Sequence, residues 1–212
     1  MKFQSDIDID FGDRDQALAL LKHTPAGIIR DGKLVPHNTG VYPTDIPIDP
    51  FLHRSSLDYN VAEDRGYQKL DFLNVSLYTQ ITSEDHLNEL MSREPDWAKI
   101  YDAEFCKRVM HIGNHHNVLM SMPEAVDSIP RMAMFLALIR PAKRHLIGES
   151  WKEIAKTIWT AEEEGYAFKK SHAVAYAHLV CVHINLLCEQ ELSISALTSS
   201  ESFLLGLPAG LL

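Results

Sequence analysis

Three aspartates alternate with apolar residues near the start of the chain, in the segment DIDIDF at positions 6–11. A strand places every second side chain on one face, so Asp6, Asp8 and Asp10 would share a face opposite the apolar residues. Neighbouring carboxylates there lie ~7 Å apart and, at an effective dielectric constant of 20, repel by roughly 2 to 3 kcal/mol. Hard oxygen ligands in such an array suit Mg²⁺ or Mn²⁺. The pattern predicts a divalent-cation site; the alternative is a solvated acidic edge strand that resists aggregation.

A second acid lies in the segment YQKLDF at positions 67–72. The same alternation sends Lys69 and Asp71 to one face and apolar residues to the other. Asp71 could therefore complete a carboxylate cluster with the first strand. An ordinary half-exposed strand is the alternative interpretation.

A third candidate site is the segment GYAFKKSHA at positions 165–173. Gly165 is predicted to end one helix, Lys169 and Lys170 follow, and Ser171 is predicted to cap the next helix, whose free N–H groups attract anions. These features indicate a phosphate site, with a routine interhelix turn as the alternative. A separate group of histidines, at positions 111, 115 and 116, lacks a metal-binding signature and predicts a surface turn.

The elements that must position these residues change in character near Thr82. Before it, the alternation predicts strands over 5–11 and 67–73, and Asp31-Gly32 predicts a hairpin turn within 27–35. Residues 36–50 contain four of the ten prolines and are predicted to form an irregular loop.

Beyond Thr82 the apolar period becomes helical. Thr82 with Asp85 predicts one helix start, and an apolar residue at every fourth position from Trp97 to Val109 predicts a further helix. Ser150 with Glu153 forms a capping box for a helix that should stop at Gly165. A last helix is predicted over 173–189, with a partly frayed end over 193–212. The sequence thus predicts an α+β fold, a small mixed sheet over 1–82, a mainly helical region over 83–190, and a tail over 191–212.

The composition limits the class of protein. The 212 residues are 46% hydrophobic and carry a formal net charge of −9, which argues against coating nucleic acid by bulk charge, although a local basic cleft or bound cations would still attract it. No apolar run approaches the ~18 to 20 residues that span a bilayer, and the start lacks a signal-peptide pattern. Three cysteines without a paired spacing predict thiols. We expect a soluble, cytoplasmic protein without a membrane partner.

In chain order, these segments resemble the bacterial replicative DNA polymerase III alpha subunit, a family C polymerase. SDIDIDFGDRDQ resembles the palm strand of that family, and GYAFKKSHAVAYA resembles its fingers motif. Further collinear similarities are AGIIRDGKLVPHNTGVYPTDIPID with EDRGYQKLDFLNVSLYTQI, SIPRMAMFLALIRP, and EQELSISALTSSE.

The resemblance implies a palm-like sheet, a fingers-like helical region and a two-metal mechanism with Mg²⁺ or Mn²⁺. It implies that Asp8, Asp10 and Asp71 are the catalytic, metal-binding acids, with Asp6 beside them, and that Lys69 lies next to the triphosphate. It further implies that four residues of the fingers motif lie near the incoming deoxynucleotide and the DNA primer-template: Lys170, Ser171, His172 and Tyr176.

The chain also departs from the family pattern. Only residues 1–4 precede the acidic strand, where the family carries a Gly-Ser motif, and Lys169 stands where the family has Asn. Three hypotheses remain open. The first is a DNA polymerase-like nucleotidyltransferase of phage type, acting in the bacterial host cell, with a second polymerase or replisome protein supplying the missing motif. The second is a non-catalytic, polymerase-derived protein that binds nucleic acid or replisome components. The third is an α+β domain that binds protein partners only.

Overall fold

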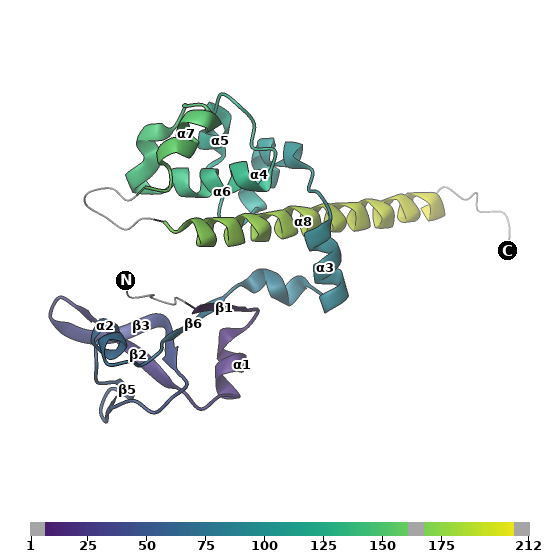
Figure 1. Ribbon diagram of the computed structural model, residues 1–212. Helices are drawn as coiled ribbons and strands as arrows, with labels where there is room; N and C mark the ends of the chain where they lie inside the picture. Colours follow the sequence, from purple (N-terminus) through teal and green to yellow (C-terminus); the bar gives the residue numbers. More distant parts are fainter. Residues whose placement is uncertain (1–6, 161–167, 206–212) are drawn as a thin grey trace, which may run out of the picture. The chain divides into compact units, whose positions relative to one another are not determined.

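The computed structural model describes residues 7–160 and 168–205, with side chains described as far as Ser195. Asp6 and Gly165, both singled out in the sequence, lie outside these residues. The chain divides into two compact units, Met1–Thr82 and Ser83–Leu212 (Figure 1). Helices make up 51% of the structure and strands 18%, so the predicted α+β class is confirmed.

The first unit is built on a four-stranded mixed sheet in the order β1-β6-β3-β2. Strand β1 pairs in parallel with β6, whereas β3 runs antiparallel to both β6 and β2. The strands of this sheet are β1 (Ile7–Phe11), β2 (Thr24–Arg30), β3 (Lys33–Tyr42) and β6 (Leu70–Asn74). The unit also contains α1 (Arg14–Ala19), β4 (Ile48–Asp49), β5 (Arg54–Ser55), α2 (Tyr59–Asp64) and the 3₁₀ helix η1 (Ser76–Gln80).

The hairpin between β2 and β3 forms at the predicted turn. Asp31 and Gly32 both have positive φ, at 51° and 73°, as a two-residue turn of the primed type requires. Strand β3 then continues through Pro36 to Tyr42, so the predicted irregular loop over 36–50 is wrong in its first half. Pro36 is tolerated because the pairing of β2 with β3 is irregular beside it, between Pro25 and Gly27.

One face of this sheet packs on α1. Leu18 of α1 is buried with Val41 and Phe72, and the side chains of Ile9 and Phe11 pack against them. The rings of Phe11 and Phe72 lie 4.8 Å apart between centroids. The apolar half of the β1 alternation therefore faces a hydrophobic core, which leaves the acidic half on the opposite face.

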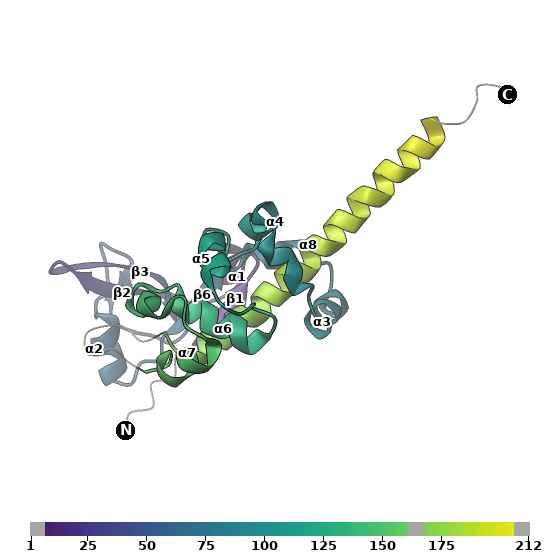
Figure 2. The ribbon, with the colours of Figure 1, turned by 90° about the horizontal axis from the view of Figure 1, so that it is seen from above.

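The second unit is all helical in the residues described. Its elements are α3 (Glu84–Ser92), η2 (Trp97–Tyr101), α4 (Ala103–Arg108), α5 (His116–Ser121), α6 (Ile129–Leu138), η3 (Pro141–Leu146), α7 (Trp151–Thr157) and α8 (Lys170–Leu205). The apolar helix α6 packs along α8 (Figures 1 and 2). Together they contribute half of the buried residues described in the core of this unit, including Phe135, Leu138 and Ile184.

Several helix ends differ from the predictions. Ser83, rather than Thr82, caps α3, because its side chain accepts a hydrogen bond from the N–H of His86. The apolar repeat from Trp97 to Val109 is divided into η2 and α4, since Asp102 is extended and caps α4 through the N–H of Phe105. These local side-chain acceptors compete with a continuous helix.

Two further helices have different lengths from those predicted. Ser150 caps α7 as its capping box indicated, but α7 ends at Thr157, well before the predicted stop. Helix α8 is longer than predicted over 173–189, beginning at Lys170 and continuing without a break to Leu205. It therefore runs through residue 190, where the sequence predicted a boundary.

Helix α8 contains a stretch, Lys170–Ser195, that by length and composition alone could cross a membrane. From the sequence alone, no apolar run of this length is expected. Just over half of the apolar window of this stretch, 56%, is buried inside the protein. Ala177, Val180 and Leu187 pack into the core of the second unit, so burial against other helices accounts for much of its apolar composition.

Candidate functional site

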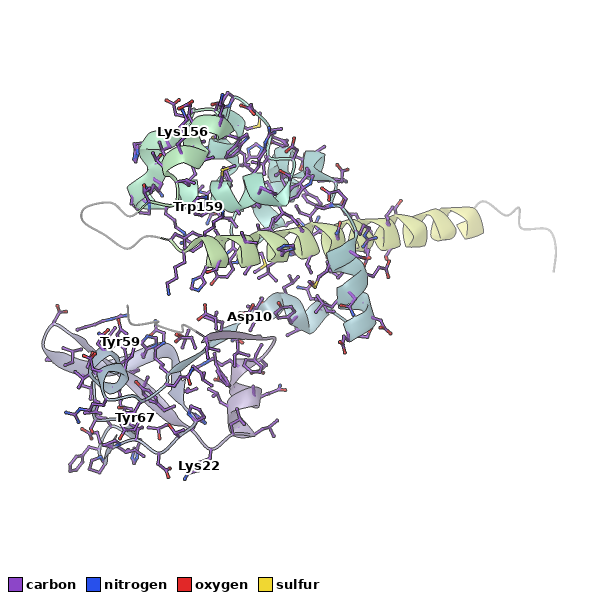
Figure 3. All side chains as sticks on the ribbon, viewed as in Figure 1. Asp10, Lys22, Tyr59, Tyr67, Lys156 and Trp159 are labelled. Carbon is purple, nitrogen blue, oxygen red and sulfur yellow. The ribbon has the colours of Figure 1, made fainter. Side chains whose placement is uncertain are left out.

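The acidic face of the sheet is formed by β1 and β6. Asp8 is the register partner of Asp71, and Asp10 that of Leu73. Paired residues of neighbouring strands project to the same face, and so do residues two apart on one strand. Asp8, Asp10 and Asp71 therefore project from one face of the sheet, opposite the core on α1. Asp10, labelled in Figure 3, is exposed on this face.

The two carboxylates of β1 influence each other. Two effects raise the pKa of Asp10 above its ordinary value: desolvation by burial, which is the larger, and the negative charge of Asp8. Asp10 in turn contributes to the raised pKa of Tyr78, after burial of that phenol. A bound cation would relieve the repulsion between Asp8 and Asp10, as the sequence argument required.

Asp71 is in a different environment from the β1 acids, since the residue is only 8% exposed. Its Oδ2 atom forms an ion pair with the ammonium group of Lys69. Its Oδ1 atom accepts a hydrogen bond of 2.7 Å from the hydroxyl of Thr39 on β3. The two oxygens of this buried carboxylate are thus bound by different partners, as a buried charge requires.

Strand β3 shapes the pocket around Asp71. Gly40 is the register partner of Asp71, and a Cβ atom at Gly40 would lie 2.7 Å from Cδ of Lys69 and 2.8 Å from Nδ1 of His37. Glycine is therefore required here for the close approach of these two side chains. The glycine is needed for space, because its backbone φ lies outside the left-handed region.

His37 supports the same segment in its neutral form. Its Nδ1 accepts hydrogen bonds from the N–H groups of Gly40, at 2.9 Å, and Thr39, at 3.4 Å. Desolvation, and then the charge of Lys69, lower the pKa of His37. The ring proton is therefore on Nε2, and the 3.6 Å approach of Nδ1 to Oδ1 of Asp71 is not an ion pair.

The described residues contain no group of three or more His, Cys, Asp or Glu side chains arranged to hold a metal ion. The backbone brings the three aspartates to one face, but the carboxylate of Asp71 is bound by Lys69 and Thr39. The residue types and the register fit a divalent cation. The described side chains as they stand do not form such a site, because Lys69 and Thr39 bind the carboxylate of Asp71.

The start of α8 contains the second set of predicted residues. Lys170 is the first helical residue and Ser171 follows it inside the first turn, so the prediction that Ser171 caps the helix is wrong. The cap position falls one residue before the helix, at Lys169, whose carbonyl accepts the N–H of Ala173.

Lys170 lies with its ammonium group 5.9 Å from the ring centroid of Trp159, which is labelled in Figure 3. His172 is half-buried in the first turn.

Tyr176 belongs to a column of stacked side chains at this end of α8. Its ring is parallel to that of Phe168, with centroids 6.2 Å apart, and packs against the ring of His111 at 4.7 Å. The guanidinium of Arg140 lies 4.7 Å from the centroid of Phe168. The turn predicted for the three histidines is present at His111, which has a positive φ of 63°, but is wrong for His116, which is the first residue of α5. Desolvation and the charge of Arg140 lower the pKa of His111.

Thr39, His37 and Gly40 are not recognisable as site residues from sequence patterns. These residues lie in the segment assigned to an irregular loop because of its prolines. Three consecutive polar residues at 37–39 give no alternation, so the only strand signal in this part of the sequence is the pair Val41 and Tyr42 that follows.

Comparison of the chain with protein-family models, curated proteins and solved structures found no match. The assignment to a class of protein therefore depends on the motifs and on the geometry described above.

Proposed function

We propose that this chain is a DNA polymerase-like nucleotidyltransferase that adds deoxynucleotides to a primer 3′-hydroxyl. The observation that carries the proposal is the register of β1 and β6, which places Asp71 directly beside Asp8 and on the same face as Asp10. Three carboxylates on adjacent parallel strands offer the hard oxygen ligands that Mg²⁺ prefers. The resemblance to family C polymerases supports the same three residues.

Each residue of this face has a role in the proposed reaction. Two Mg²⁺ ions bound at the carboxylates would supply Lewis-acid stabilisation of the primer hydroxyl and of the leaving group. The aspartates act as ligands and need not transfer protons. Lys69 neutralises charge on the triphosphate. The primer oxygen forms a bond to the α-phosphorus, the bond from that phosphorus to the β-phosphate oxygen breaks, pyrophosphate leaves, and the hydroxyl proton passes to water.

The proposal gives the start of α8 a role in nucleotide binding. Lys170 and Ser171 lie in its first turn, where backbone N–H groups favour anions. Tyr176 offers an aromatic ring already stacked on Phe168. The proposal includes a second polymerase or replisome protein that supplies the Gly-Ser element of the family.

Primer extension tests the proposal. The full chain, alone and with candidate replisome proteins, is incubated with a primed DNA template, deoxynucleoside triphosphates and Mg²⁺. We expect Asp8→Asn and Asp71→Asn each to reduce extension by at least a hundredfold, since each removes a charged ligand. Asp45→Asn is the matched control, because Asp45 is an exposed acid of the same unit that pairs with Lys22. Extension that persists unchanged in both site variants would contradict the assignment.

One observation favours a second function, a non-catalytic protein that binds nucleic acid or replisome components. Asp71 is bound by Lys69, and the described side chains form no metal-binding group. Calorimetric titration distinguishes the two functions. Mn²⁺ binding that is lost in Asp8→Asn supports the enzyme, whereas DNA binding that is independent of metal supports the binding protein.

A further inference from the structure

We propose that Thr39 is a positioning residue for Asp71, and that the ammonium group of Lys69 binds this carboxylate until a divalent cation displaces it. The inference rests on the proposed function, because it concerns the same carboxylate face. It assigns the two oxygens of Asp71 to two different tasks. Oδ1 is held by the protein, and Oδ2 is exchanged between an ammonium group and a metal ion.

The Thr39 contact has the features of a fixed interaction. The hydroxyl of Thr39 donates to Oδ1 of Asp71 at 2.7 Å, and the hydrogen bond bridges two adjacent strands. The backbone of Thr39 is itself held, because His37 Nδ1 accepts the N–H groups of Thr39 and Gly40. A hydroxyl on a restrained strand orients the carboxylate plane, which sets where Oδ2 points.

The Lys69 contact has the features of an exchangeable one. Lys69 lies just before β6 and two residues before Asp71, and its flexible side chain reaches Oδ2 of that carboxylate. While paired with Asp71, the same ammonium group also lies 5.8 Å from the ring centroid of Tyr59. Because the four-carbon stem of lysine is flexible, the ammonium group can move away from Asp71 when a divalent ion takes its place.

Charge favours the exchange. Asp8, Asp10 and Asp71 share this face of the sheet, and the single positive charge of Lys69 is paired with Asp71. A divalent ion carries twice the charge of the ammonium group and can contact carboxylates of both strands at once. Binding of the divalent ion would release Lys69 from Asp71. The released ammonium group could then pair with the negatively charged triphosphate.

Amine footprinting measures the exchange directly. The full chain is briefly acetylated with and without saturating MgCl₂ at matched ionic strength, and each lysine is quantified by mass spectrometry. We expect Mg²⁺ to raise the acetylation of Lys69 about threefold or more, because the ammonium is released from its ion pair. Lys22, labelled in Figure 3, is the internal control, since its side chain is 87% exposed and its reactivity should not change.

Variants of Thr39 test the positioning role. Thr39→Val keeps the shape of the side chain and removes the hydroxyl, and we expect the Mg²⁺ dissociation constant from calorimetry to rise about tenfold, the value of one hydrogen bond to a charged group. Thr39→Ser keeps the hydroxyl and should bind Mg²⁺ within about twofold of the unmodified chain. This rescue separates positioning from a general effect on folding, which circular dichroism of all three proteins checks.

The outcomes separate this inference from the proposed function. Mg²⁺ binding with unchanged Lys69 acetylation overturns the exchange, and Thr39→Val binding as tightly as the unmodified chain overturns the positioning role. In both cases the proposed function stands. Absence of any Mg²⁺ binding to the unmodified chain overturns the proposed function and this inference together.

Discussion

The stability of the second unit should depend on the protonation of one histidine of α8. Nδ1 of His183 accepts a hydrogen bond of 3.0 Å from the backbone N–H of Met110, so this nitrogen must be unprotonated. Burial, and then the charges of Arg108 and His111, lower the pKa of His183 to about 4. In an unfolded chain the pKa of histidine is about 6.5.

The sign and size of the effect follow from these two values. Because the pKa is lower in the folded state, the unfolded chain binds more protons, and His183 destabilises the fold as the pH falls from about 6.5 toward 4. Between pH 7 and pH 5 the free energy of unfolding should fall by about 2 kcal/mol on account of this residue alone.

Urea denaturation followed by tryptophan fluorescence measures this loss. All three tryptophans, at positions 97, 151 and 159, belong to the second unit, so the signal reports its unfolding. His183→Asn removes the titration and keeps an acceptor for the N–H of Met110. Between pH 7 and pH 5 this variant should lose about 2 kcal/mol less than the unmodified chain. His178→Asn is the control, because His178 is an exposed histidine of the same helix. Equal pH dependence in His183→Asn and the unmodified chain would refute the reasoning.

Three further predictions concern packing. Asn185→Ala should lower the free energy of unfolding by about 2 to 3 kcal/mol in the same urea assay, because its amide donates to two carbonyls at the end of α3, at 2.9 and 2.8 Å; exposed Asn117→Ala should have little effect. Gly40→Ala should destabilise the first unit by about 1 to 3 kcal/mol, measured by hydrogen exchange of its sheet, because the new Cβ overlaps its neighbours; Gly32→Asn in the hairpin turn should be tolerated. Of the three thiols, Cys188 should react first with a disulfide reagent in the native protein, since the other two are buried, and equal rates for all three would contradict this packing.

The features predicted best from the sequence are those set by a few neighbouring residues. Asp31-Gly32 identified the hairpin because few residue pairs readily adopt positive φ at two consecutive positions. Ser150 identified the start of α7 for a similar reason, as its side chain accepts the N–H of Glu153 three residues later. Neither feature depends on the rest of the fold.

The errors came from local periodicity that the chain interrupts. From Trp97 an apolar residue does recur at every fourth position, but Asp102 ends one helix and begins the next. The apolar residues of both helices are nevertheless buried in the core. Because of its prolines, the segment 36–50 was predicted to be a loop, although its first part is the end of β3. There the pairing of Gly40 and Val41 with β6 outweighs the poor strand propensity of the segment. Tertiary pairing of this kind has no signature within the segment itself.

The geometry of the acidic face follows from the apolar residues rather than from the acids. Phe72 and Ile9 are register partners and share the core with Leu18. A slip of one residue along β6 would turn Phe72 toward solvent and bury the carboxylate of Asp71 among aromatic rings, at a cost of several kcal/mol. The hydrophobic core therefore enforces the register that brings Asp71 beside Asp8. The sequence revealed which face each strand buries, and the structure adds that the two strands are neighbours.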